Sequence, residues 1–163
     1  MPESLLEHPR VLGLDVGART IGMAVSDPLG LTAQGLGTIR RRNKRYDFDQ
    51  LARTIREYQV AEIVVGYPLR LSGVPSAQSA KMSDFAEDLR GRFRLPVHLV
   101  DERLTSVQAN RLLRDAELSI EKRAQAVDRL AAILILQLFL DRRASKPSGA
   151  AQDPAGSESA SGT

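Results

Sequence analysis

Three acidic side chains lie where carboxylates are unusual. Asp15 is inside an apolar run at residues 11–16, Glu102 follows a second apolar run at 97–100 after one further acid, and Asp128 lies in a long segment of apolar helical periodicity. An ionised carboxylate in apolar surroundings is costly unless a cation or strong hydrogen bonds compensate it. Each of the three therefore predicts a close partner, either a protein cation or a metal ion.

The sequence around each acid also leaves an ordinary structural explanation open. Two β-branched-rich runs flank the break at residues 17–20, which is a hairpin pattern, so Asp15 could simply cap the turn at a strand end. Asp128 shares one helical stripe with apolar residues, because the spacing 4, 3, 4 and 3 joins Ala124, Asp128, Ala131, Ile135 and Leu138. A salt bridge to Arg123 or Arg129 would satisfy it without a metal.

Carboxylates that converge favour metal chemistry. Neighbouring carboxylates raise one another's pKa, and a divalent ion between them reverses this effect. Oxygen ligands favour Mg²⁺ or Mn²⁺ over Zn²⁺. One or two such ions could polarise a phosphodiester, activate water and stabilise the leaving oxygen. Spacing alone does not bring Asp15, Glu102 and Asp128 together, so this step depends on the fold.

A dense basic run suggests what these acids could act on. Residues 40–45 hold five cations in six positions, namely Arg40, Arg41, Arg42, Lys44 and Arg45. Their mutual repulsion predicts a loop. The run is either a solvated charge cluster or a clamp for a phosphate backbone. Four further cations are candidate backbone contacts: Arg19, Arg70, Lys81 and Arg103.

The elements that must position these residues follow from apolar periodicity. Strands are predicted at 11–16 and 21–26 as a hairpin, with a third strand of the meander over 31–39. Further strands are predicted at 62–66 and 97–100, and helices at 48–58, 77–91, 105–116 and 121–142. Asp47 and Gln50 have capping-box spacing before the first helix. Strand–helix alternation after a meander predicts an α/β mixed sheet with helices on its faces.

Length and composition limit the alternatives. The chain of 163 residues suits one domain, predicted over 1–143, followed by a disordered tail over 144–163 in which Ala, Ser, Gly and Pro supply 15 of 20 residues. With no cysteine there is no disulfide or thiolate metal site, which fits a cytoplasmic protein. No apolar run approaches the roughly 20 residues of a membrane span. Neither His8 nor His98 is assigned to catalysis.

Four segments together resemble the YqgF family, also called RuvX, of ribonuclease H-like nucleases. The first is Leu14-Asp15-Val16-Gly17 continuing to Ser26-Asp27, and the second is Val65-Gly66-Tyr67-Pro68-Leu69. The third is Asp101-Glu102-Arg103-Leu104-Thr105, and the fourth is Val127-Asp128 with Ala131-Ala132 and Ile135-Leu136-Gln137. Each motif is weak alone, but their order and spacing are specific, and the likeness covers residues 11 to about 141.

The resemblance implies a five-stranded mixed sheet whose first three strands form an antiparallel meander. It implies that Asp15, Glu102 and Asp128 bind one or two magnesium or manganese ions as the catalytic set. It also implies a nuclease that matures the 5′ end of the precursor of small-subunit ribosomal RNA. Members of the family have alternatively been regarded as Holliday junction resolvases, which would make branched DNA the substrate.

Two other function classes stay open at this point. The segment from Asp15 to Gly22 also resembles the first phosphate loop of actin-like and sugar-kinase proteins, but these close two such domains on ATP and this chain has room for one. A non-catalytic nucleic-acid-binding factor would keep the fold without using the acids. The chain is expected to be a monomer or a homodimer without a disulfide link, and no short motif separates RNA from DNA.

Overall fold

A single mixed sheet organises the computed structural model, which describes residues 8–67, 77–101 and 120–145. Within these ranges the sheet has five strands in the spatial order β3-β2-β1-β4-β5. Their bounds are β1 (Arg10–Val16), β2 (Thr20–Ser26), β3 (Ala33–Arg40), β4 (Val60–Tyr67) and β5 (Val97–Asp101). The first three strands are antiparallel, and β4 and β5 run parallel to β1. The predicted mixed sheet with its N-terminal meander is confirmed.

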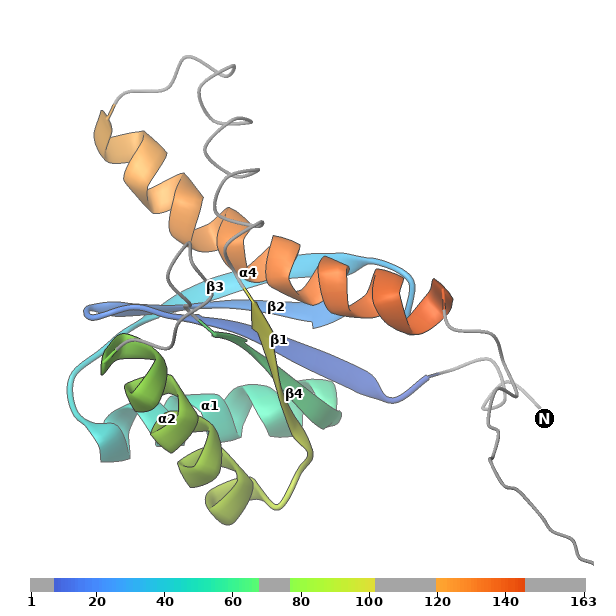
Figure 1. The fold of residues 1–163 in the computed structure, drawn as a ribbon, viewed down its shortest axis with the longest axis horizontal. Coiled ribbons are helices and arrows are strands. Elements are labelled where there is room, and N and C mark those ends of the chain that lie inside the picture. Colours follow the sequence, from blue (N-terminus) through green and yellow to red (C-terminus); the bar gives the residue numbers. More distant parts are fainter. Residues whose placement is uncertain (1–7, 68–76, 102–119, 146–163) are drawn as a thin grey trace, which may run out of the picture.

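Helices cover both faces of the sheet (Figure 1). α1 (Lys44–Tyr58) and α2 (Ala77–Phe93) pack on one face, and α4 (Ile120–Ser145) crosses the other. The helix predicted at 105–116 and the tail from residue 146 lie outside the described residues. Among the helices that the structure describes, none is long and apolar enough to cross a bilayer.

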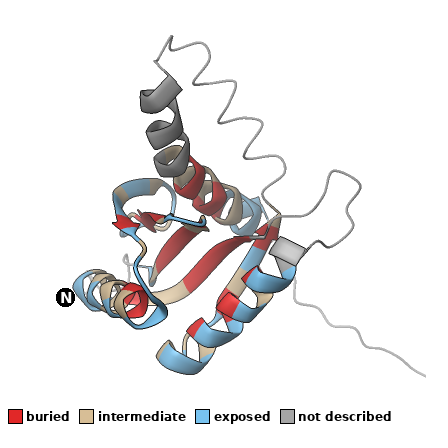
Figure 2. Cartoon of the chain, turned by 90° about the vertical axis from the view of Figure 1, so that its left-hand side faces the viewer, coloured by how far each residue is buried: buried red, intermediate tan, exposed pale blue. Residues whose placement is uncertain are grey.

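The core is divided by the sheet into two clusters. Leu12, Leu14 and Val16 of β1 join the buried side chains of α1 and α2. Val11 joins the α4 cluster with Leu136 and its neighbours. This alternation follows from the two-residue period of a strand. Figure 2 shows the consequence: central strands such as β1 and β2 are buried between helices whose outer faces are exposed, whereas the edge strand β3 is mostly exposed. The face of β1 that holds Val11, Gly13 and Asp15 is therefore the α4 face.

Gly13 lets α4 lie directly on β1. A Cβ atom added at Gly13 would lie 2.7 Å from the Cβ of Leu136 and 3.2 Å from the carbonyl oxygen of Ala132. Both atoms belong to the helix framework rather than to the end of a movable side chain. The Gln137 side chain also joins the helix to β3, because its Oε1 accepts from the Ala33 N–H at 2.9 Å. The position of α4 over the strands is therefore fixed closely.

The start of α1 differs from the prediction. The helix begins at Lys44 rather than at 48, and its N-cap is Asn43, whose side chain accepts from the Tyr46 N–H at 2.8 Å. The prediction of a loop holds only for the middle of the basic run: Arg40 ends β3, residues 41–43 form the connection, and Lys44 opens α1. Repulsion is relieved locally, since Arg41 pairs with Asp47 and Lys44 with Asp88. Asn43 is as favourable an N-cap residue as Asp47, and the prediction overlooked it.

A charged cluster fastens the end of α4 to the sheet. Glu62 of β4 accepts from Arg143 at 2.7 and 2.8 Å, and lies 2.9 Å from the Nε2 of His98 on β5. Burial would raise the pKa of Glu62, but the hydrogen bonds from Arg143 and His98 outweigh it and lower the pKa below its ordinary value of 4.5. The cluster therefore stabilises the fold when Glu62 is ionised.

This cluster predicts an acid-dependent loss of stability. Because the folded-state pKa of Glu62 is lowered, its contribution is present above pH 4.5 and is lost as pH falls through the folded-state pKa. Glu62→Gln is expected to lower the free energy of unfolding by about 1–2 kcal/mol at neutral pH, and by much less near pH 3. Urea unfolding at both pH values measures this. Glu57→Gln, on the exposed side of α1, is the control, and an equal effect of Glu62→Gln at both pH values would contradict the assignment.

Candidate active site

Asp15 lies at the carboxyl end of β1, where the parallel strands of the sheet end together. It is half-buried, it is the second-last residue of β1, and it is opposite Gly22 of β2. The carboxyl ends of parallel strands form the usual position for ligand binding in open α/β sheets. Asp15 also projects to the α4 face, as the packing of Val11 and Gly13 requires. The predicted strand position of Asp15 is confirmed, and its role stays a prediction.

The carboxyl end of β5 lies at the same edge of the sheet. The strand register pairs Leu14 with Val65, Val65 with Leu99, and Tyr67 with Asp101, the last residue of β5. β1 and β5 are two strand spacings apart, which is about 10 Å. Glu102 follows Asp101 directly in the sequence but lies outside the described residues. Whether its side chain faces Asp15 stays a prediction.

The direction of α4 brings its N-terminal part toward the same edge. Its C-terminal Arg143 pairs with Glu62, which is opposite Val11 near the start of β1, so the helix runs antiparallel to β1. Ala132 and Leu136 lie over Gly13. Residue 128 lies one turn from Ala132 toward the helix N-terminus, about 6 Å further along the helix.

Asp15 lies two residues beyond Gly13 on β1, about 7 Å further along the strand. The turn of α4 that holds residue 128 therefore follows the contact with Gly13 in the same direction as Asp15. Figure 1 shows this N-terminal part of α4 inclined away from the strands. The side chain of Asp128 lies outside what the structure describes, so its approach to Asp15 stays a prediction.

One of the three predicted metal ligands, Asp15, has a described side chain. Among the described side chains, no group of three His, Asp or Glu residues is placed to hold a metal ion. Two of the three predicted ligands are outside that set. The donor that is described, a half-buried carboxylate at a strand end, has the hard oxygen chemistry that Mg²⁺ and Mn²⁺ prefer.

The predicted basic residues separate into exposed and structural ones. The exposed ones are Arg19, Arg40, Arg42, Lys44, Arg45 and Lys81. Arg19 lies in the turn between β1 and β2, where its carbonyl oxygen accepts from the Arg41 N–H at 2.8 Å. Arg70 and Arg103 lie outside the described residues. The structure thus places several exposed cations at the same end of β1 as Asp15.

Arg41 has a structural role that the sequence analysis missed. Its Nη1 donates to the Gly17 carbonyl at 2.7 Å and its Nε to the Asp47 carboxylate at 3.2 Å. Asp47, only 2% exposed, also accepts from the Arg42 N–H at 3.0 Å. A buried charge of this kind needs such partners. The only sequence signal was an acid shortly after the basic run. Arg41 therefore anchors the turn that follows Asp15 rather than presenting a free guanidinium.

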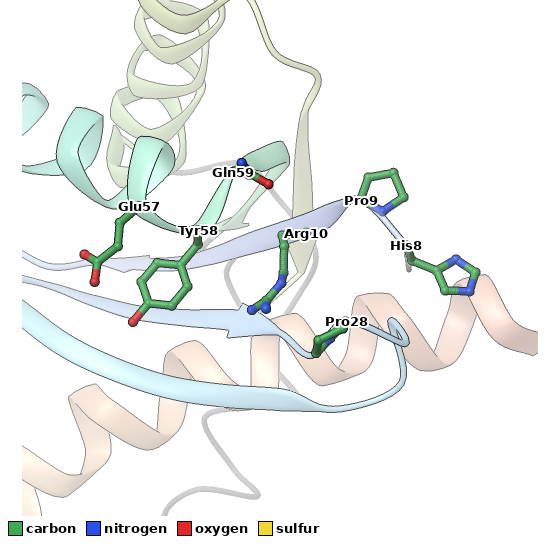
Figure 3. Close-up of a pocket in the computed structure, with 7 residues that line it drawn as sticks. All are labelled: His8, Pro9, Arg10, Pro28, Glu57, Tyr58 and Gln59. Atoms are coloured by element: carbon green, nitrogen blue, oxygen red, sulfur yellow. The ribbon is translucent and has the colours of Figure 1, made fainter. Parts of the chain in front are cut away.

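A hollow lies at the opposite end of β1 from Asp15. Figure 3 shows it between the start of β1, the loop after β2 and the end of α1. Its volume is about 390 Å³, and its lining is His8, Pro9, Arg10, Pro28, Glu57, Tyr58 and Gln59. Arg10 is used internally, because its Nη1 donates to the Ser26 carbonyl at 3.2 Å. The Arg10 guanidinium also lies 6.0 Å from the centroid of the Tyr58 ring, so the contacts of this cation are made within the protein.

The fold and the position of Asp15 define a class of proteins. The solved structure of T. thermophilus RuvC in complex with a Holliday junction substrate aligns with a TM-score of 0.53 at 14% identity, over 85% of this chain and 98% of the RuvC chain. This chain thus has the ribonuclease H-like α/β fold. A model of the family described as "RuvX: Holliday junction resolvase" matches residues 9–142. The chain belongs to the RuvX family.

Relatives match nearly their whole length. A protein of Koribacter versatilis named "Putative pre-16S rRNA nuclease" is 57% identical over 143 residues, covering 88% of this chain and 94% of the relative. A protein of the same name from Moorella thermoacetica is 51% identical over 133 residues, covering 82% of this chain and 95% of the relative. The resemblance to the RuvX family stated from the motifs is confirmed.

Proposed function

We propose that this chain is a metal-dependent endonuclease that hydrolyses phosphodiester bonds in 5′-end processing of pre-16S ribosomal RNA. The observation that carries the proposal is the 57% identity, over 88% of the chain, to a relative named for that activity. The position of Asp15 at the carboxyl end of β1 supports it, because ligands of open α/β sheets bind there. This role fits the cytoplasmic location expected from the sequence.

The proposed catalytic residues are Asp15, Glu102 and Asp128, which would hold one or two magnesium or manganese ions. When bound, such an ion supplies Lewis-acid activation of the phosphodiester and of the attacking water. Asp15 contributes a carboxylate on a strand that is fixed on both sides by β2 and β4, so little reorganisation is needed for binding. Glu102 and Asp128 would complete the set from the end of β5 and from α4.

The exposed cations around this end of β1 would hold the nucleic-acid backbone. They are Arg19, Arg40, Arg42, Lys44, Arg45 and Lys81, and we include Arg70 and Arg103 from the sequence alone. Phosphate contacts fix the position of a nucleic acid and make its binding salt-dependent. Arg41 acts differently, since its Nε already donates to Asp47 and its Nη1 to the Gly17 carbonyl. The active species would be a monomer or a homodimer.

A second candidate is a Holliday junction resolvase, with branched DNA as substrate. The description of the matching family and the fold of RuvC both favour it. At 14% identity the likeness to RuvC concerns the fold alone. A resolvase cuts two strands in step, so this candidate requires a symmetric dimer. The ribosomal role needs no dimer.

Cleavage of two labelled substrates separates these candidates. A precursor RNA with the 5′ leader of 16S rRNA and a four-way DNA junction would be incubated with the full chain, with Mg²⁺ or with EDTA. We expect cleavage within the RNA leader, dependent on Mg²⁺, and an intact junction. Paired symmetric nicks in the junction alone would make the resolvase function primary. Binding of RNA without any cleavage would support a non-catalytic factor instead.

A further inference from the structure

A cavity of about 490 Å³ lies beside the turn between β1 and β2, on the opposite face of the sheet from α4. Its lining starts with Val16 and Gly17, directly after Asp15, and continues to the start of α1 and to Lys81 and Met82 of α2. Val16 and Met82 belong to the core cluster of α1 and α2. The cavity is therefore next to the proposed catalytic carboxylate but separate from its face.

The cavity is strongly cationic. Four cations line it, Arg41, Arg42, Lys44 and Lys81, against one carboxylate, Asp47. Asp47 is 2% exposed, and both of its oxygens already accept hydrogen bonds, from the Arg41 side chain and the Arg42 N–H. It can therefore neutralise little else. Like charges gathered in a concave surface focus a positive potential and favour an anion there.

The four cations differ in how far they are already engaged in hydrogen bonds and ion pairs within the protein. The Arg41 side chain already donates hydrogen bonds to Gly17 and Asp47, so it forms part of the cavity wall. Lys44 lies 2.9 Å from Asp88, but side-chain exposures of 68% and 44% make this a weak ion pair. Arg42 stacks on the Tyr46 ring at 4.4 Å, which leaves its edge available for hydrogen bonds.

Lys81 has no ion pair with any side chain that the structure describes. It is carried by α2, whereas Arg42 directly precedes the N-cap of α1. Two available cations thus line one cavity from two different elements. The N-terminus of the 15-residue helix α1 adds the positive end of a helix dipole, because Asn43 and Lys44 line the same cavity.

We propose that this cavity is a phosphate subsite that takes a single phosphodiester group of the bound strand, with Arg42 and Lys81 contacting the same phosphate. The choice of a nucleic-acid strand as ligand rests on the proposed function. Gly17 directly follows β1 and is two residues beyond Asp15, a separation of at most about 7 Å for an extended chain. The phosphate in the cavity would therefore be a near neighbour of the one hydrolysed, and it would fix the register of the strand at Asp15.

A double-mutant cycle tests whether the two cations share one phosphate. The affinity for a fluorescent single-stranded RNA would be measured in an Asp15→Asn background with Arg42→Met, Lys81→Met and both. We expect each single change to weaken binding about fivefold to tenfold, and the double change to cost clearly less than their product. The slope of log affinity against log salt should fall by about 0.7 in each variant, including the double one.

Arg53→Met is the matched control, because Arg53 is an exposed cation of α1 that does not line the cavity. When Arg53→Met is combined with Lys81→Met, the two changes should affect the affinity for RNA independently of each other. Independent effects of Arg42→Met and Lys81→Met, or a slope that falls by about 1.4 in the double variant, would overturn a shared phosphate. Equal melting temperatures of all variants exclude loss of folding as the cause.

A titration with inorganic phosphate separates this proposal from the function on which it rests. In backbone amide NMR spectra, phosphate should shift the signals of Gly17, Ala18 and Lys44, and Lys81→Met should weaken this response. If these signals respond while RNA does not bind, the proposed function fails and the subsite stands. If RNA binds but neither the signals nor the two variants respond, the subsite is wrong and the function is unaffected.

Discussion

Asp15→Asn is expected to remove metal-dependent cleavage while leaving the fold intact. The change keeps the size of the side chain at the end of β1 but removes the charge that a divalent ion requires. The loss should be at least about 1,000-fold in kcat, which corresponds to about 4 kcal/mol of transition-state stabilisation. Initial rates on the cleaved substrate, with Mg²⁺ in excess, measure this effect.

Asp84→Asn is the matched control, because Asp84 is an exposed carboxylate of α2 on the other side of the sheet from α4. It should retain the wild-type rate. The melting temperatures of both variants should stay close to that of the wild type. Retention of cleavage by Asp15→Asn would remove this residue from the mechanism and favour a turn-capping role for it.

Gly13→Ala is expected to damage both stability and activity. The new Cβ would lie 2.7 Å from the Cβ of Leu136, and 3.2 Å from a backbone oxygen of Ala132, so α4 must move away from β1. Overpacking of this kind should lower the free energy of unfolding by about 2 kcal/mol. Because α4 carries Asp128, a displacement near 1 Å would also lower kcat by about 100-fold. Urea unfolding and initial rates test the two effects separately.

Gly37→Ala provides the comparison. Gly37 is also a strand glycine, in β3, but a Cβ atom there would meet nothing within 4 Å. The free energy of unfolding of the Gly37→Ala variant should change by less than about 0.5 kcal/mol, and its activity should not fall. If Gly13→Ala kept full activity despite a clear loss of stability, the position of α4 over β1 would not govern the chemistry.

Much of this architecture was predictable because local patterns and tertiary packing agree. The two-residue period of a strand is enough to put Asp15 on the face opposite to Leu12 and Leu14, and the division of β1 between the two core clusters agrees with it. The predicted bounds of β5 and α4 differ from the structure by a few residues at most. The motifs around Asp15, Glu102 and Asp128 predicted the family, because order and spacing are readable without a structure.

Features that depend on contacts between distant residues were not predictable. The Asn43 N-cap is a local signal that the loop prediction overlooked, whereas the charge density of the basic run does not reveal that Asp47 neutralises Arg41. Glu62, His98 and Arg143 are far apart in the sequence, so their cluster has no local signal. Likewise, the close approach of Leu136 to Gly13 arises only when α4 packs on the sheet.

We expect Asp15, Glu102 and Asp128 to hold a divalent metal jointly at the carboxyl end of β1. Anomalous diffraction from crystals of the full chain soaked in Mn²⁺ tests it most directly. We expect an anomalous peak in contact with all three carboxylates, and no peak in Asp15→Asn crystals treated in the same way. Three well-ordered carboxylates without a peak between them, or a peak elsewhere in the protein that survives Asp15→Asn, would contradict it.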